Sequence, residues 1–341
     1  MRLGFAVKVL GAGGLPSQDT RKWQSGPHLK VSLDHLGAVV DYLQDNDIRM
    51  YRMTASLAPY ATHPDHPEFH DQVAESRDEL ARFGEQARAA DVRLSTHPGQ
   101  YIVLNSENPA TQESAMRDLD LQGELMDAMG LGPEAVVILH VGGAPDGVAN
   151  GIERFVAGFD RLTEAAQRRI VIENDDRTYG LRDVLALSER IQRPVVWDIL
   201  HHHCHDPEGI DDREALRLAR ATWPAGVTPK IHYSSPRLDV EERKKKVGRR
   251  VERSLVLPQL RAHADLIDPI AFEDFVTRIA VDQDVDVLLE AKAKDLALLR
   301  LREQMAARGL FPEEHLTAVP LAAGVDAADE AVTPLGAAAA A

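Results

Sequence analysis

The chain has 341 residues, a hydrophobic content of 44%, one cysteine and a formal net charge of −15. The single cysteine, Cys204, excludes an internal disulfide, and the apolar runs are too short to cross a bilayer. The N-terminus lacks the apolar core and cleavage site of a signal peptide, so we expect a cytoplasmic protein without a membrane partner.

Taken in chain order, segments with the composition of buried strands alternate with segments of helical periodicity. The eight predicted strands are Arg2–Val7, Ile48–Met53, Val92–Thr96, Ala135–Leu139, Arg169–Ile172, Val195–Asp198, Thr228–Ile231 and Val285–Leu289. The predicted helices are Val31–Leu43, Val73–Ala90, Thr111–Met129, Gly151–Arg168, Leu181–Ile191, Arg213–Ala221 and Phe272–Ile279.

This alternation predicts an α/β fold with a parallel sheet that is buried on both faces. Eight strands are the number that closes a (β/α)8 TIM barrel, whose functional sites lie at the carboxyl ends of the strands. A doubly wound open sheet is the alternative, but it would not gather many strand ends in one place. We expect one barrel domain over residues 1–310 and a mobile, alanine-rich, low-complexity tail over residues 311–341.

Residues of types that commonly bind metals, histidine and the acidic residues, lie at the ends of six predicted strands, and two further histidines lie nearby. The eight residues are His97, His140, Glu173, Asp198, His201, His232, His263 and Glu290. They are more ligands than one ion needs, and sites with two or three ions share bridging carboxylates, for which Glu173 and Glu290 are the natural candidates. The mixture of imidazole and carboxylate suits Mn²⁺, Zn²⁺ or Fe²⁺ better than Mg²⁺. Such a cluster supports either phosphodiester hydrolysis or sugar isomerisation, and fold and ligands alone do not separate the two.

Seven spaced motifs make the pattern more specific. They are HPGQY at His97–Tyr101, HVGG at His140–Gly143, ENDD at Glu173–Asp176, WDxxHH at Trp197–His202, KIHYS at Lys230–Ser234, HADLID at His263–Asp268 and LLEAKAKD at Leu288–Asp295. Together, over roughly residues 1–300, they resemble the UV damage endonuclease family, which is similar to endonuclease IV and has a xylose-isomerase-like barrel. The resemblance implies cleavage of the DNA phosphodiester immediately 5′ to cyclobutane dimers and 6-4 products, usually with Mn²⁺.

The resemblance also assigns roles to residues. It implies that the eight side chains above are the metal ligands, and that Glu173, Lys230 and Glu290 are catalytic. Lys230 would contact phosphate or, when modified, bridge metals; otherwise it is a solvated surface lysine. Gln100 and Tyr101 resemble the family's pair that probes the lesion, although Tyr101 could instead pack the loop. An apurinic/apyrimidinic endonuclease and a metal-dependent sugar isomerase or epimerase are the alternative functions.

Two features depart from the family pattern. Phe5 and Val9 stand where the family has a tyrosine and an asparagine, which puts the range of lesions in doubt but not the metal site. The segment Arg237–Arg253, here called the basic arm, looks longer than the family's usual connection before HADLID and has eight basic and four acidic side chains. We expect a helical or flexible arm that contacts phosphates through Lys244, Lys245 and Lys246. The expected partner is damaged double-stranded DNA, bound by a monomer that needs no other protein.

Overall fold

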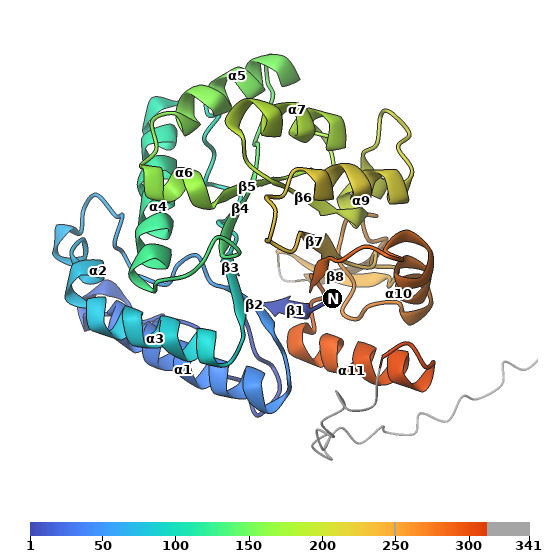
Figure 1. Cartoon of the computed structure of the whole chain (residues 1–341), viewed down its shortest axis with the longest axis horizontal. Coiled ribbons are helices and arrows are strands. Elements are labelled where there is room, and N and C mark those ends of the chain that lie inside the picture. Colours follow the sequence, from blue (N-terminus) through green and yellow to red (C-terminus); the bar gives the residue numbers. More distant parts are fainter. Residues whose placement is uncertain (249, 312–341) are drawn as a thin grey trace, which may run out of the picture.

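The computed structural model describes residues 1–248 and 250–311, in which eight parallel strands close into a barrel and helices surround it (Figure 1). Around the barrel the order is β1-β10-β7-β6-β5-β4-β3-β2. The strands are β1 (Leu3–Ala6), β2 (Met50–Met53), β3 (Arg93–Thr96), β4 (Val136–His140), β5 (Ile170–Glu173), β6 (Val195–Asp198), β7 (Lys230–Tyr233) and β10 (Asp286–Leu289). Each overlaps its predicted segment, so the predicted TIM barrel is confirmed and the open-sheet alternative is wrong.

The helices occupy most of the predicted segments, but their first and last residues differ from the predicted ones. They are α1 (Leu29–Asp45), α2 (Gln72–Glu75), α3 (Arg77–Ala89), α4 (Pro109–Ala128), α5 (Val148–Phe159), α6 (Glu164–Arg169), α7 (Leu181–Ile191), α8 (Ile199–Cys204), α9 (Asp212–Ala221), α10 (Pro269–Asp274) and α11 (Lys294–Ala307). The single helix predicted over Gly151–Arg168 is wrong, because Thr163 starts a second helix by accepting a hydrogen bond from the amide of Ala166. The helix predicted over Val73–Ala90 is likewise interrupted, at Ser76.

Residues on one strand alternate between the helix-facing side and the barrel interior. On β4, β5 and β6 the interior side chains below the strand ends are apolar and cluster with Trp223. Elsewhere the interior is charged: Arg93 on β3 and Asp286 on β10 form a buried ion pair with 2.9 Å between Nη1 and Oδ2. The carboxyl ends of all eight strands meet at one rim, which is where the predicted ligands lie.

The basic arm is not helical, so the helical alternative is wrong. It contains β8 (Glu241–Val247), which pairs with the antiparallel β9 (Arg250–Val256) as a separate two-stranded sheet. Gly248 has a φ of 61° in the connecting turn, a conformation that glycine adopts without strain. The prediction for the alanine-rich tail falls on residues 312–341, which lie outside the described part of the chain. Among the described residues, no helix is long and apolar enough to cross a membrane.

Candidate metal centre

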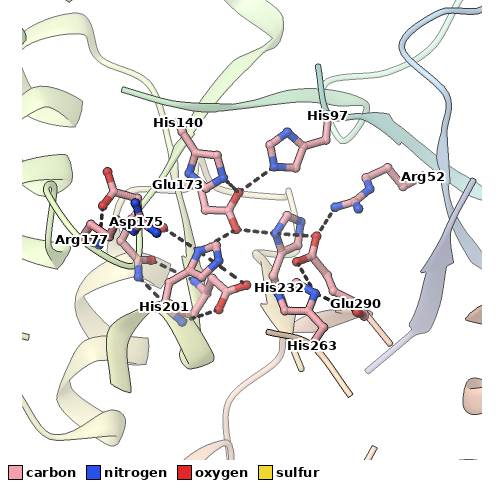
Figure 2. Close-up of polar contacts among 12 residues, drawn as sticks. Arg52, His97, His140, Glu173, Asp175, Arg177, His201, His232, His263 and Glu290 are labelled. Carbon is pink, nitrogen blue, oxygen red and sulfur yellow. Dashed lines mark hydrogen bonds and ion pairs between the residues drawn. The ribbon is translucent and has the colours of Figure 1, made fainter. Parts of the chain in front are cut away.

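Glu173 lies at the centre of the rim, surrounded by four imidazoles (Figure 2). Its Oε1 is 2.7 Å from Nδ1 of His232 and 3.7 Å from Nδ1 of His201. Its Oε2 is 3.0 Å from Nε2 of His97 and 3.5 Å from Nε2 of His140. The four histidines come from four different βα units, so closure of the barrel is what brings them to one carboxylate.

Three groups of ligand atoms, each within 4.8 Å of one another, share Glu173. The groups are His97, Glu173 and His232; His140, Glu173 and His201; and Glu173, Asp198, His232 and Glu290. A carboxylate that belongs to three ligand groups has the placement that a bridging ligand between neighbouring ions requires. His263 belongs to none of the three, although its Nδ1 lies 3.8 Å from Oε2 of Glu290 and 2.9 Å from the Glu290 backbone oxygen.

Asn174 fixes the position of two predicted ligands. Its amide nitrogen donates to the Asp198 carbonyl at 3.0 Å, and its Oδ1 accepts from the Asp198 amide at 2.9 Å. Its backbone oxygen lies 3.1 Å from Nδ1 of His201. Asp198 in turn caps α8 by accepting from the His201 amide at 2.8 Å. The polar run after Glu173 was the only sequence signal for Asn174, and the sequence predicted no role for it.

Arg52 is the second site residue that the sequence did not predict. It extends from β2 and forms an ion pair with Glu290, which lies on the far side of β1 (Figure 2). Both side chains are largely buried, 14% and 8% exposed. Nothing in the sequence relates the two positions, because their proximity depends on closure of the barrel.

Burial and neighbouring charges shift the protonation equilibria of this cluster. Burial alone would raise the pKa of Glu173, but His232 and His140 hold it well below its usual range. Burial raises the pKa of Asp198, although His201 opposes that effect. For His201 burial favours the neutral ring, but Asp198 and Glu173 outweigh it and raise the pKa to about 9. The carboxylates thus favour a proton on His201, whereas burial lowers the pKa of His97 to about 4 although Glu173 opposes that effect.

The residues fit a group of divalent cations. Within the described chain, three buried ligand atoms of the cluster have no hydrogen-bond partner; they are His140 Nδ1, Asp198 Oδ2 and His232 Nε2. Unpaired buried polar atoms are costly, and a cation that accepts their lone pairs would remove that cost. The presence of a buried cluster of potential ligands is therefore confirmed.

Lys230 lies inside the barrel, two residues before His232 and on the same side of β7. It is fully buried, which excludes the solvated surface lysine, and its Nζ lies 2.6 Å from Oγ of Ser95. Burial, with Arg93 nearby, lowers the pKa of this amine well below its usual range. Lys230 is therefore placed below the ligand cluster and not at the outer surface.

The predicted DNA-contacting residues lie apart from the ligand cluster, on exposed segments. Gln100 and Tyr101 follow His97 in the loop after β3, and Tyr101 is 80% exposed. Lys244, Lys245 and Lys246 lie exposed on β8. The structure thus does not support Tyr101 as a packing residue.

Phe5 and Val9 are both core residues in this chain. Phe5 is fully buried and contacts Tyr51 edge-on, with 5.4 Å between ring centroids, and Val9 is 2% exposed. Neither side chain has a polar group, so neither can donate or accept a hydrogen bond.

Comparison with known proteins agrees with this geometry. The model of the family described as "UV-endonuclease UvdE" matches residues 28–311. The UV DNA damage endonuclease of Bacillus velezensis is 31% identical over 280 residues, which cover 82% of this chain and 81% of that protein.

Two solved structures are similar in fold. The crystal structure of SacUVDE has 27% identity and a TM-score of 0.75, covering 91% of this chain and all of that one. Endonuclease IV from Thermus thermophilus shares the fold, with a TM-score of 0.54 and 14% identity over 90% of this chain and all of that one. The predicted class of activity is confirmed: the chain belongs to the UV-endonuclease UvdE family.

Proposed function

We propose that this UV endonuclease cuts duplex DNA immediately 5′ to cyclobutane dimers and 6-4 products, leaving a 3′-hydroxyl and a 5′-phosphate. The observation that carries the proposal is the position of Glu173, which three ligand groups share at the barrel rim. A carboxylate placed in this way suits a reaction in which both the attacking and the leaving oxygen of a phosphodiester need a nearby cation.

We propose two or three divalent ions at this rim, with Mn²⁺ as the first candidate and Zn²⁺ or Mg²⁺ as alternatives. The ligands would be His97, His140, Glu173, Asp198, His201, His232, His263 and Glu290. When bound, such ions lower the pKa of water and neutralise charge on the phosphate. Asn174 holds Asp198 and His201 in place, and Arg52 neutralises part of the charge of Glu290.

Three protein side chains are proposed to be catalytic: Glu173, Glu290 and Lys230. The two glutamates hold the cluster together, since each has two oxygens close to several imidazoles. The full burial of Lys230 supports a role beside the ligands, from within the barrel, and not direct contact with a solvated backbone.

Recognition of the lesion is proposed to depend on Gln100 and Tyr101. A photoproduct stacks poorly, so extruding it costs less than extruding normal bases. The exposed ring of Tyr101 can then fill the vacated space by stacking. Lys244, Lys245 and Lys246 would add phosphate contacts that do not depend on sequence.

The test uses 30-base-pair duplexes labelled at either 5′ end and incubated with Mn²⁺ or with a chelator. One duplex carries a single cyclobutane dimer, one carries an abasic site, and one is intact. We expect one Mn²⁺-dependent nick directly 5′ to the dimer, with a 3′ end that a polymerase can extend. Cleavage of the abasic duplex alone would assign the chain to the apurinic/apyrimidinic alternative.

We also propose the cellular location and the oligomeric state of the enzyme. The single cysteine supports a reducing, cytoplasmic location. We propose that the protein acts as a monomer, which sedimentation at several protein concentrations would test.

A further inference from the structure

We propose that the β8–β9 hairpin is a two-stranded ribbon that lies in a groove of the duplex beside the lesion, with Val251 and Leu255 toward the bases. The duplex partner rests on the proposed function, whereas the choice of face rests on the register of the hairpin. A two-stranded ribbon fits the major groove of B-DNA. Each strand has seven residues, which at about 3.4 Å per residue is about 24 Å, the length of about seven base pairs.

The stem of the hairpin is attached next to the ligand cluster. Pro236 and His263 form an antiparallel bridge, and the amide of Arg237 donates to the Ala262 carbonyl at 2.6 Å. The amide of Ala264 donates to the Ser235 carbonyl at 2.9 Å. Since His263 contacts Glu290, a duplex bound by the ribbon would pass close to the proposed metal centre.

The register divides the side chains of the hairpin between two faces. Lys244 is opposite Arg253, Lys246 is opposite Val251, and Glu242 is opposite Leu255. Because neighbouring residues on a strand point to opposite faces, Lys245 does not share a face with Lys244 and Lys246. The aliphatic face consists of Glu242, Lys244, Lys246, Val251, Arg253 and Leu255. The reverse face includes Arg243, Lys245, Arg250, Glu252 and Ser254.

The aliphatic face combines cations with large side chains that nothing covers in the described chain. Val251 is 59% exposed and Leu255 is 78% exposed. Aliphatic groups on DNA-binding arms contact base edges and can enter between base steps, while the cations beside them hold the phosphates. On the reverse face Val256 is partly buried at the stem end of β9, and the other described side chains are polar or charged.

The charge of the arm favours DNA over a second copy of this protein. Arg237–Arg253 has a net charge of +4 within a chain of −15, which leaves −19 for the remaining residues. In a two-fold dimer through the aliphatic face the two arms would face each other, and their positive charges would repel. Arg243, Lys245, Lys246 and Arg250 have no ion pair within the described residues, and Lys244 and Arg253 pair only with Glu242. A polyanion would supply the missing partners.

The test compares two double variants that remove the same charge from opposite faces. Lys244→Gln with Lys246→Gln changes the aliphatic face, and Arg243→Gln with Arg250→Gln changes the reverse face. Affinity of the metal-loaded, full-length protein for an undamaged 30-base-pair duplex is measured by fluorescence anisotropy between 50 and 300 mM NaCl, about the range where phosphate contacts dominate. We expect the first variant to flatten the plot of log K against log salt by about 1.8, at about 0.9 per contact, and the second to change it little.

A third variant, Val251→Ser with Leu255→Ser, tests the apolar contact separately. We expect about tenfold weaker binding with an unchanged salt slope, because no charge is altered. Since both side chains are exposed, melting temperatures should match the parent protein. Equal slopes for the two charge-matched variants, or full affinity of the serine variant, would overturn the inference.

Self-association is tested in the same series. A dimer of the DNA-free protein that Leu255→Ser abolishes would assign the aliphatic face to a second copy and overturn the inference. The proposed function fails by a different result, the absence of a nick 5′ to the dimer in the parent protein. If the parent protein does not nick the duplex but the two charge-matched variants differ in salt slope as expected, the proposed reaction is rejected and the inference about the hairpin stands.

Discussion

Nζ of Lys230 lies 2.6 Å from Oγ of Ser95, and both side chains are fully buried in the barrel. Both residues lie two positions before a predicted ligand, His232 and His97 respectively, so they form the layer directly beneath the cluster. A buried amine with a single hydroxyl partner contributes little to stability, because burial without a paired carboxylate lowers its pKa and leaves a polar group with only one hydrogen bond. This placement is better explained by a role in the reaction.

Lys230→Met should therefore separate activity from stability. Methionine fills a similar volume without an amine, so the free energy of unfolding should stay the same or rise by about 1 kcal/mol. Nicking of dimer-containing duplex should fall sharply, while the bound metal is measured separately by elemental analysis. A variant that nicks at the parent rate would show that Lys230 is not catalytic.

Arg52→Met tests the ion pair across the closing strands. Without Arg52, Glu290 stays buried near Glu173 and Asp198, and breaking such a pair costs about 3 kcal/mol or more. In urea denaturation with chelator, the free energy of unfolding should fall by that amount. With Mn²⁺ the loss should be smaller, because bound cations would neutralise Glu290 in place of Arg52. Arg217→Met is the control, since Arg217 pairs with Glu214 on the exposed surface and its loss should leave the urea midpoint close to that of the parent protein. Equal losses with and without Mn²⁺ would mean that no cation binds beside Glu290.

Glu173→Gln should abolish nicking and leave binding to damaged DNA intact. The amide keeps the volume of the side chain but removes the charge that three ligand groups share. Asn174→Ala provides the graded comparison, because losing a hydrogen-bond partner of the ligands costs about 10–100-fold in metal affinity. In Mn²⁺ titrations, Glu173→Gln should lose more metal affinity than Asn174→Ala. If Glu173→Gln binds Mn²⁺ as tightly as the parent protein, Glu173 does not bridge metal ions.

The strands and their terminal ligands could be predicted because both depend on local sequence. Each strand is a short apolar run, and the next residue on the interior side, such as His97 or Glu173, lies at the rim whatever the rest of the chain does. Arg52 and Asn174 could not be found in this way. Their partners are set by barrel closure and by a cap at the start of α8, which strand periodicity does not encode.

The hairpin conformation of the basic arm was also not predicted from the sequence. Its charged side chains give no apolar period of either 2 or 3.6 residues, so the pattern does not distinguish helix from strand. Gly248 and the valines at positions 247, 251 and 256 were the available signals for a hairpin, since glycine suits the turn and β-branched residues favour strands. Eight basic residues obscured that signal.

Tyr101→Ala tests whether the exposed ring probes the lesion. The ring is 80% exposed on the loop after β3, so its loss should not disturb His97 or the fold. Stacking of an aromatic ring on a base contributes about 1–3 kcal/mol, which predicts about 5–150-fold weaker binding to dimer-containing duplex. Affinity for intact duplex and Mn²⁺ content should stay at the parent values, and Tyr101→Phe, which keeps the ring, should bind the dimer normally. If Tyr101→Ala loses metal while its affinity for the dimer holds, the ring supports the ligand loop and does not enter the DNA.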